Sequence, residues 1–112
     1  MLVDTGAACT MVDDRTPVAL GHKPVRLASI GGATGRPESR PVYLMELTLR
    51  FTDGAGTSHH VTMDQEVVGL EPQPQRAPGF GLLGRDCLAR MRFIYDGPLG
   101  AFSLILAARP PG

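Results

Sequence analysis

An aspartate near the start of the chain lies in the stretch LVDTGA (residues 2–7), whose residue types and spacing suit acid–base chemistry. The apolar pair before it predicts the end of a strand, and Asp4-Thr5-Gly6 predicts a tight loop that presents a carboxylate. Taken alone, such a loop can be a plain turn in which the Asp side chain bonds nearby backbone. Gly6 and Ala7 favour a second interpretation, because small residues let another backbone approach closely. That interpretation is a carboxylate that leaves a buried strand in a crowded place.

A second stretch, GLLGRD at residues 81–86, predicts a short buried strand ended by Gly84 and followed by a helix. Together the two stretches resemble the retropepsin-like aspartic proteases, the family of the retroviral proteases and their cellular relatives. This family pairs a hydrophobic-hydrophobic-Asp-Thr-Gly-Ala loop with a later hydrophobic-hydrophobic-Gly-Arg-Asp/Asn stretch that opens the only helix. Similarity to bacterial members extends through residues 82–104, and the resemblance covers nearly the whole chain.

The resemblance implies an aspartic endopeptidase that hydrolyses peptide or protein substrates and needs no cofactor. Two carboxyl groups about 3 Å apart share one proton, because both cannot comfortably ionise. The ionised group takes a proton from a water molecule, while the protonated group polarises the scissile carbonyl. The chain has a single Asp-Thr-Gly, so the resemblance implies a homodimer with Asp4 of each subunit on a two-fold axis.

Individual roles follow from the resemblance, residue by residue. Asp4, Thr5 and Gly6 form the catalytic loop, in which Thr5 bonds to the partner's loop and Gly6 contacts the substrate backbone. Ala7 is a further substrate-binding position. Structural support of the site is assigned to the second stretch, namely Leu82, Leu83, Gly84, Arg85 and Asp86.

The glycine-rich stretch SIGGATG at residues 29–35 allows three interpretations. A phosphate-binding loop is disfavoured, because no Lys-Ser/Thr follows and no helical pattern begins there. A plain surface turn remains open. The position of Ile30-Gly31-Gly32, between the catalytic loop and the long central strand, is similar to the glycine-tipped flap of retropepsins. The resemblance therefore implies that these three residues bind substrate.

Histidine and cysteine suggest two other kinds of chemistry, and the spacing favours neither. On a strand, His59 and His60 point to opposite sides, and His60 lies roughly 13 Å from Asp64, so a metal site is not expected. Cys9 follows the catalytic loop, but no histidine stands at a recognisable spacing for a thiol nucleophile. A small buried side chain is the expected role of Cys9.

The elements that must hold these loops are mostly strands. VYLMELTLRF at residues 42–51 alternates apolar and polar residues, TDGAGTS predicts a turn, and HHVTM predicts a return strand with Val61 and Met63 inward. RFIYD and AFSLIL flank GPLG and predict a second hairpin. EPQPQRAPG predicts an exposed connection. The only helical pattern runs from Arg85 to about Met91, with Cys87, Leu88 and Met91 on one face. The expected fold class is all-β: a small closed or partly open barrel of the retropepsin type with one short helix near the C-terminus.

Composition suits one globular domain and excludes several classes of function. The resemblance implies that this is a single retropepsin-like domain over residues 1–112. The chain is 43% hydrophobic and 20% charged, and its formal net charge is zero, which predicts no nucleic-acid partner. No apolar run is long enough to span a bilayer and no signal peptide is visible, so a soluble chain is expected. Cys9 and Cys87 allow at most one disulfide and have too little company for a zinc site.

The chain departs from the family pattern in two places, and each changes what is expected of its structure. Viral members place a carboxylate directly after Asp-Thr-Gly-Ala to receive the arginine of the helix motif, whereas this chain has Ala8. Family members also have strands before the catalytic loop, so the expectation is a domain that lacks its N-terminal strands. The alternative function is a non-catalytic retropepsin-like binding or dimerisation module. An unrelated β-barrel that merely contains Asp-Thr-Gly is the third interpretation.

Overall fold

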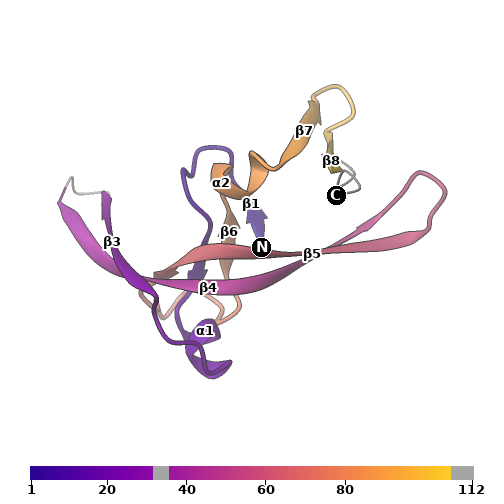
Figure 1. Cartoon of the computed structure of the whole chain (residues 1–112). Helices are drawn as coiled ribbons and strands as arrows, with labels where there is room; N and C mark the ends of the chain where they lie inside the picture. The colour runs from indigo at the N-terminus through magenta and orange to yellow at the C-terminus, as the bar shows by residue number, and fades with distance from the viewer. Residues whose placement is uncertain (32–35, 107–112) are drawn as a thin grey trace.

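The structure is a computed structural model that describes residues 1–31 and 36–106 (Figure 1). It contains eight strands and two short helices within these residues. In chain order they are β1 Leu2–Val3, β2 Met11–Asp13, α1 Arg15–Ala19, β3 Arg26–Gly31, β4 Pro37–Thr52, β5 Ser58–Leu70, β6 Gly81–Leu83, α2 Arg85–Leu88, β7 Met91–Asp96 and β8 Ala101–Leu106. The prediction of a mostly β chain is confirmed.

The long hairpin of β4 and β5 is the centre of the fold. Its antiparallel register runs from Val42 opposite Val68 to Thr52 opposite Ser58. Tyr43 and Met45 are buried and Leu47 and Leu49 half-buried, while the alternate side chains from Leu44 onward are exposed. This pattern follows from the period of two in a strand with one covered face. The predicted hairpin is therefore confirmed, and β5 continues further than expected because Val67 and Val68 are also buried.

Six strands form one sheet in the order β1-β6-β2-β5-β4-β3, and β7 and β8 form a separate two-stranded sheet. The large sheet ends at β1 on one side and β3 on the other. Within the residues that the structure describes, the sheet is thus open, and the closed form of the expected barrel is not found. The sheet does not close because, in this part of the chain, its two edge strands do not pair with each other: β3 pairs only with β4, and β1 only with β6.

The core consists of two clusters of buried side chains. One contains Val12, Tyr43, Met45 and Val67. The other contains Leu83, Cys87 and Leu88, with Val3 and several hydrophobic side chains of the two hairpins packed against it. The second cluster joins α2 and β6 to the strand that leads into Asp4, which is how the fold positions the predicted site.

The helices differ from expectation in two ways. The helix after Gly84 begins at Arg85 as predicted but ends at Leu88, because Met91 pairs with Leu106 as the first residue of β7. Helix α1 was not predicted, so the expectation of a single helix is wrong. Neither helix is long or apolar enough to cross a membrane, as far as the described residues go.

Candidate active site

The Asp-Thr-Gly loop and the Leu-Leu-Gly-Arg-Asp stretch meet in space, although they lie at opposite ends of the chain. Strand β1 runs parallel to β6, with Leu2 opposite Leu82 and Val3 opposite Leu83. The N–H of Asp4 donates to the carbonyl oxygen of Leu83 over 3.0 Å. The loop's far end is also attached, since the N–H of Arg85 donates to the carbonyl oxygen of Ala7 over 2.9 Å. The two motifs singled out in the sequence therefore form one site.

Gly84 is required by this close approach. A Cβ atom at this position would lie 2.4 Å from both the carbonyl carbon and the carbonyl oxygen of Cys9, and 2.9 Å from the N of Thr10. Such distances are impossible for a side chain without backbone movement. The backbone of the segment after the Asp4 loop thus passes directly over Gly84, and glycine permits that contact.

The Asp4 carboxylate is half-buried, and Thr5 and Gly6 beside it are exposed. One carboxylate oxygen, Oδ1, accepts a hydrogen bond from the N–H of Gly6 over 2.9 Å. The carbonyl oxygen of Asp4 accepts from the N–H of Ala7 over 3.2 Å, which closes the tight loop. Among the described residues, the other carboxylate oxygen has no hydrogen-bond donor. It is therefore the atom available to a water molecule or to a second carboxyl group.

A partly buried hydrogen-bond network next to the loop was not predicted from the sequence. Asp86 Oδ1 accepts from both the N–H and the hydroxyl of Thr10, over 2.9 Å and 2.7 Å, and from the N–H of Cys87 over 2.7 Å. The Thr10 hydroxyl in turn accepts from the N–H of Gly84 over 3.1 Å. Asp86 Oδ2 accepts from the side-chain amide of Gln65 over 3.0 Å. Asp86 was expected to support the site. Its carboxylate bonds to Thr10, Gln65 and Cys87, and Thr10 donates two of these hydrogen bonds.

Arg85 contributes to this site through its backbone. Its side chain is exposed, and its guanidinium group forms no ion pair or hydrogen bond within the described part of the chain. In the sequence, Ala8 stands where the resemblance would place a carboxylate partner for Arg85. Arg85 therefore supports the loop by donating its N–H to Ala7.

The expected flap residues do not join Asp4 in the structure. Ile30 and Gly31 pair with Glu38 and Pro37 at the end of the β3–β4 hairpin, which Figure 1 shows well apart from β1. Gly32 lies outside the described residues. A hairpin is thus present at the predicted place, and its contact with substrate stays a prediction.

The histidines and cysteines form no additional catalytic cluster. His59 Nε2 lies 2.7 Å from Asp53 Oδ2, and no group of three or more His, Cys, Asp or Glu side chains able to hold a metal occurs among the described residues. Both cysteines are free. Burial, and secondarily the negative charge of Asp86, raises the pKa of each thiol, so neither is activated as a nucleophile.

A second carboxylate cluster borders the segment that follows the loop. Asp13 is fully buried at the end of β2 and forms a two-bond ion pair with Arg15, over 2.9 Å and 2.8 Å. This hydrogen bonding lowers the pKa of Asp13 to about 2. Asp14 pairs with Arg40, which also donates to the carbonyl oxygen of Gly69. These pairs use both carboxylates for structure, so neither is available to serve as the second acid beside Asp4.

Comparison with known proteins gives no relative. No family model, no curated protein and no solved structure matches the chain.

Proposed function

We propose that the chain is an aspartic endopeptidase of the retropepsin type that acts as a homodimer. The observation that carries the proposal is the docking of the Asp4 loop onto the corner between β6 and α2, with hydrogen bonds at both ends of the loop. Composition does not require this contact. It joins the two stretches on which the resemblance rests.

The chemistry follows from the exposure and bonding of Asp4. A half-buried carboxylate with one oxygen held by Gly6 and the other free can accept a proton from a bound water. One carboxylate is insufficient, because the scissile carbonyl must also be polarised by a protonated group. The chain has a single Asp-Thr-Gly, and Asp13, Asp14 and Asp86 are occupied by partners of their own. A second copy of Asp4 supplies the missing acid, and the two then titrate as one unit.

Substrate contacts are assigned on the same basis. Gly6 and Ala7 are positioned to line the substrate backbone next to Asp4. The β3–β4 hairpin, where Ile30 and Gly31 lie, is the proposed flap. In the proposed dimer Thr5, which is exposed beside Asp4, faces the partner's loop.

The first test is cleavage of casein and of a mixed peptide library at mildly acidic pH. The parent chain is expected to cleave and to be inhibited by pepstatin, and Asp4→Asn to have no activity above background. Asp64→Asn is the matched control, because this exposed carboxylate on β5 accepts no side-chain hydrogen bond among the described residues. An Asp4→Asn variant that cleaves at the parent rate contradicts the proposal.

The second test addresses the dimer directly. Parent and Asp4→Asn chains are mixed in equal amounts and allowed to exchange subunits. If each active unit needs two Asp4 residues, activity falls to about one quarter of that of the parent at the same total concentration. A monomeric enzyme retains about one half. A chain that dimerises in sedimentation but never cleaves supports the non-catalytic module instead.

A further inference from the structure

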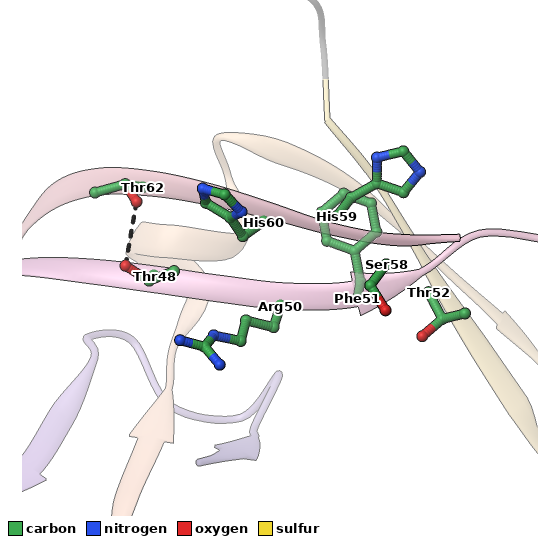
Figure 2. A pocket seen from close by; sticks show the side chains of 8 residues that line it. All are labelled: Thr48, Arg50, Phe51, Thr52, Ser58, His59, His60 and Thr62. Atoms are coloured by element: carbon green, nitrogen blue, oxygen red, sulfur yellow. Dashed lines mark hydrogen bonds between the residues drawn. The ribbon is translucent and has the colours of Figure 1, made fainter. Parts of the chain in front are cut away.

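The outer face of the β4–β5 hairpin carries a polar surface that the proposed active site does not use (Figure 2). The register places three pairs of side chains opposite one another on this face: Thr48 with Thr62, Arg50 with His60, and Thr52 with Ser58. All six are exposed. With Phe51 and His59 they line a shallow hollow of about 600 Å³. We call these three pairs the polar ladder.

The polar ladder is rich in hydrogen-bond donors. The Arg50 guanidinium carries five N–H groups, and the His60 ring carries at least one in either protonation state. The hydroxyls of Thr48 and Thr62 bond to each other over 3.1 Å. Only one of the two protons is used in that bond, so the other remains free to donate to a ligand. Such a set of donors beside a permanently charged guanidinium is suited to an oxyanion.

The two basic side chains have no counterion within the part of the chain that the structure describes. Arg15, Arg26 and Arg40 each have a carboxylate within 2.9 Å, whereas Arg50 and His60 form no ion pair or hydrogen bond there. Figure 2 shows Arg50 lying along the outer side of β4 and His60 above the gap between the strands. Because nothing anchors the long Arg50 side chain, it can swing toward His60 without breaking a contact.

The charges at either end of the polar ladder limit the size of the ligand. The carboxylates of Glu46 and Asp64 stand opposite each other on the same face, two rows from the Arg50–His60 row. Two rows correspond to roughly 13 Å along a strand. At the other end lies Asp53, which is already paired with His59. An extended polyanion would meet these carboxylates, whereas a compact oxyanion would contact the basic and hydroxyl side chains alone.

We propose that the polar ladder binds a compact tetrahedral oxyanion of the phosphate type through Arg50 and His60, with the flanking hydroxyls donating further hydrogen bonds. The ligand is inorganic phosphate or a small phosphomonoester, which share this chemistry. The proposal is independent of the protease function, because it uses the exposed face of the hairpin and none of the residues around Asp4.

The experiment is a two-dimensional ¹H–¹⁵N NMR titration of the folded chain with inorganic phosphate at constant ionic strength. Saturable shifts are expected for amides of residues 48–52 and 58–62. Arg50→Gln is expected to weaken binding by at least about tenfold, because the charge-assisted hydrogen bonds from the guanidinium to the oxyanion are lost. Arg92→Gln, an exposed arginine on β7, is the matched control and is expected to leave the affinity unchanged.

Titrations with other ligands identify which anion binds, and a second variant is included in case Arg50→Gln does not fold. Phenyl phosphate replaces phosphate to show whether an ester is preferred, and sodium chloride alone reports non-specific charge effects. His60→Ala is the second variant, and its spectrum, like that of Arg50→Gln, must show a folded chain. Equal shifts with chloride, or unchanged phosphate affinity in whichever of the two variants folds, overturn the proposal.

Discussion

The N–H of Asp4 lies 3.0 Å from the carbonyl oxygen of Leu83 and donates a hydrogen bond to it. This bond continues the parallel pairing of β1 with β6, so the aspartate leaves its strand directly beside the corner at Gly84. The position of the carboxylate therefore depends on residues near the other end of the chain. Variants at that corner are expected to disturb Asp4 without touching it.

Gly84→Ala is expected to destabilise the fold by at least about 1–3 kcal/mol, the usual range for overpacking. The added Cβ would lie 2.4 Å from the backbone of Cys9, which cannot move without shifting the neighbouring Asp4 loop. Urea unfolding measures the change. Gly79→Ala is the control, because a Cβ there meets nothing within 4 Å. Equal midpoints for the two variants would mean that the corner is looser than the structure shows.

Thr10→Val is expected to lower the free energy of unfolding by about 1–3 kcal/mol. The substitution keeps the shape of a fully buried side chain but removes the hydroxyl, which leaves the N–H of Gly84 without its acceptor and Asp86 without one donor. Thr10→Ser retains both bonds and is expected to lose less. Thr62→Val is the control, because it measures how much a Thr-to-Val substitution changes stability at an exposed position. The result is checked by thermal melting of the three variants.

Asp4→Asn is expected to change stability by no more than about 0.5 kcal/mol, the usual range for a surface change. The asparagine side-chain oxygen can still accept the hydrogen bond from the N–H of Gly6. Asp4→Ala removes that acceptor and is expected to melt at a lower temperature. This contrast separates chemistry from folding, because an inactive Asp4→Asn chain with the parent melting temperature has lost only its acid. A large drop in its melting temperature would instead point to loss of structure as the cause of inactivity.

Thiol reactivity checks the second core cluster. Cys87 has no exposed surface and Cys9 is only partly covered, and burial raises the pKa of both thiols. A thiol-specific reagent near neutral pH is therefore expected to modify Cys9 slowly and Cys87 only after unfolding. Mass spectrometry of digested samples assigns each site, with the urea-denatured chain as the reference. Rapid modification of both cysteines in the folded chain would contradict the packing around α2.

The sequence was informative where one face of a strand is buried. Alternation along residues 42–51 predicted a strand within β4, because a helix does not produce a period of two. The stretch HHVTM predicted the return strand, with Val61 and Met63 inward. Helix α1 was missed since it is five residues long and contains a proline and two β-branched residues. It is held by contacts from elsewhere, such as the Thr16 hydroxyl donating to the carbonyl oxygen of Pro78. Local propensity cannot reveal a helix that tertiary contacts create.

Within the candidate site, the sequence predicted that the two motifs act together. It did not predict which residues form hydrogen bonds with Asp86. Thr10 and Asp86 are far apart in the sequence, and neither belongs to a pattern that selects the other. Ala8 showed only that Arg85 lacks the carboxylate that the family pattern places there, and the sequence left open whether another acid replaces it. Spacing thus identified the loops, and packing determined which side chains support them.

The ion pair between the buried Asp13 and the partly exposed Arg15 makes stability depend on pH in the acidic range. Hydrogen bonds from the Arg15 side chain are the main cause that lowers the pKa of Asp13 to about 2, against an ordinary value of 3.8. The unfolded chain therefore binds this proton more readily than the folded chain. The contribution of Asp13 to stability is full above the ordinary value and is lost as the pH falls toward 2.

Asp13→Asn is accordingly expected to be less stable than the parent at neutral pH, since it leaves the Arg15 guanidinium without its counterion. The gap in urea midpoint between the two is expected to narrow as the pH is lowered from about 5 to about 2, where the parent's own carboxylate becomes protonated. At the mildly acidic pH of the proposed cleavage assay, which lies above the lowered pKa of Asp13, the pair is still ionised and the fold keeps this contribution. The measurement is a series of urea unfolding curves between pH 2 and pH 7, with Asp64→Asn as the control for loss of one exposed carboxylate. If the gap stays constant across the series, folding does not lower the pKa of Asp13.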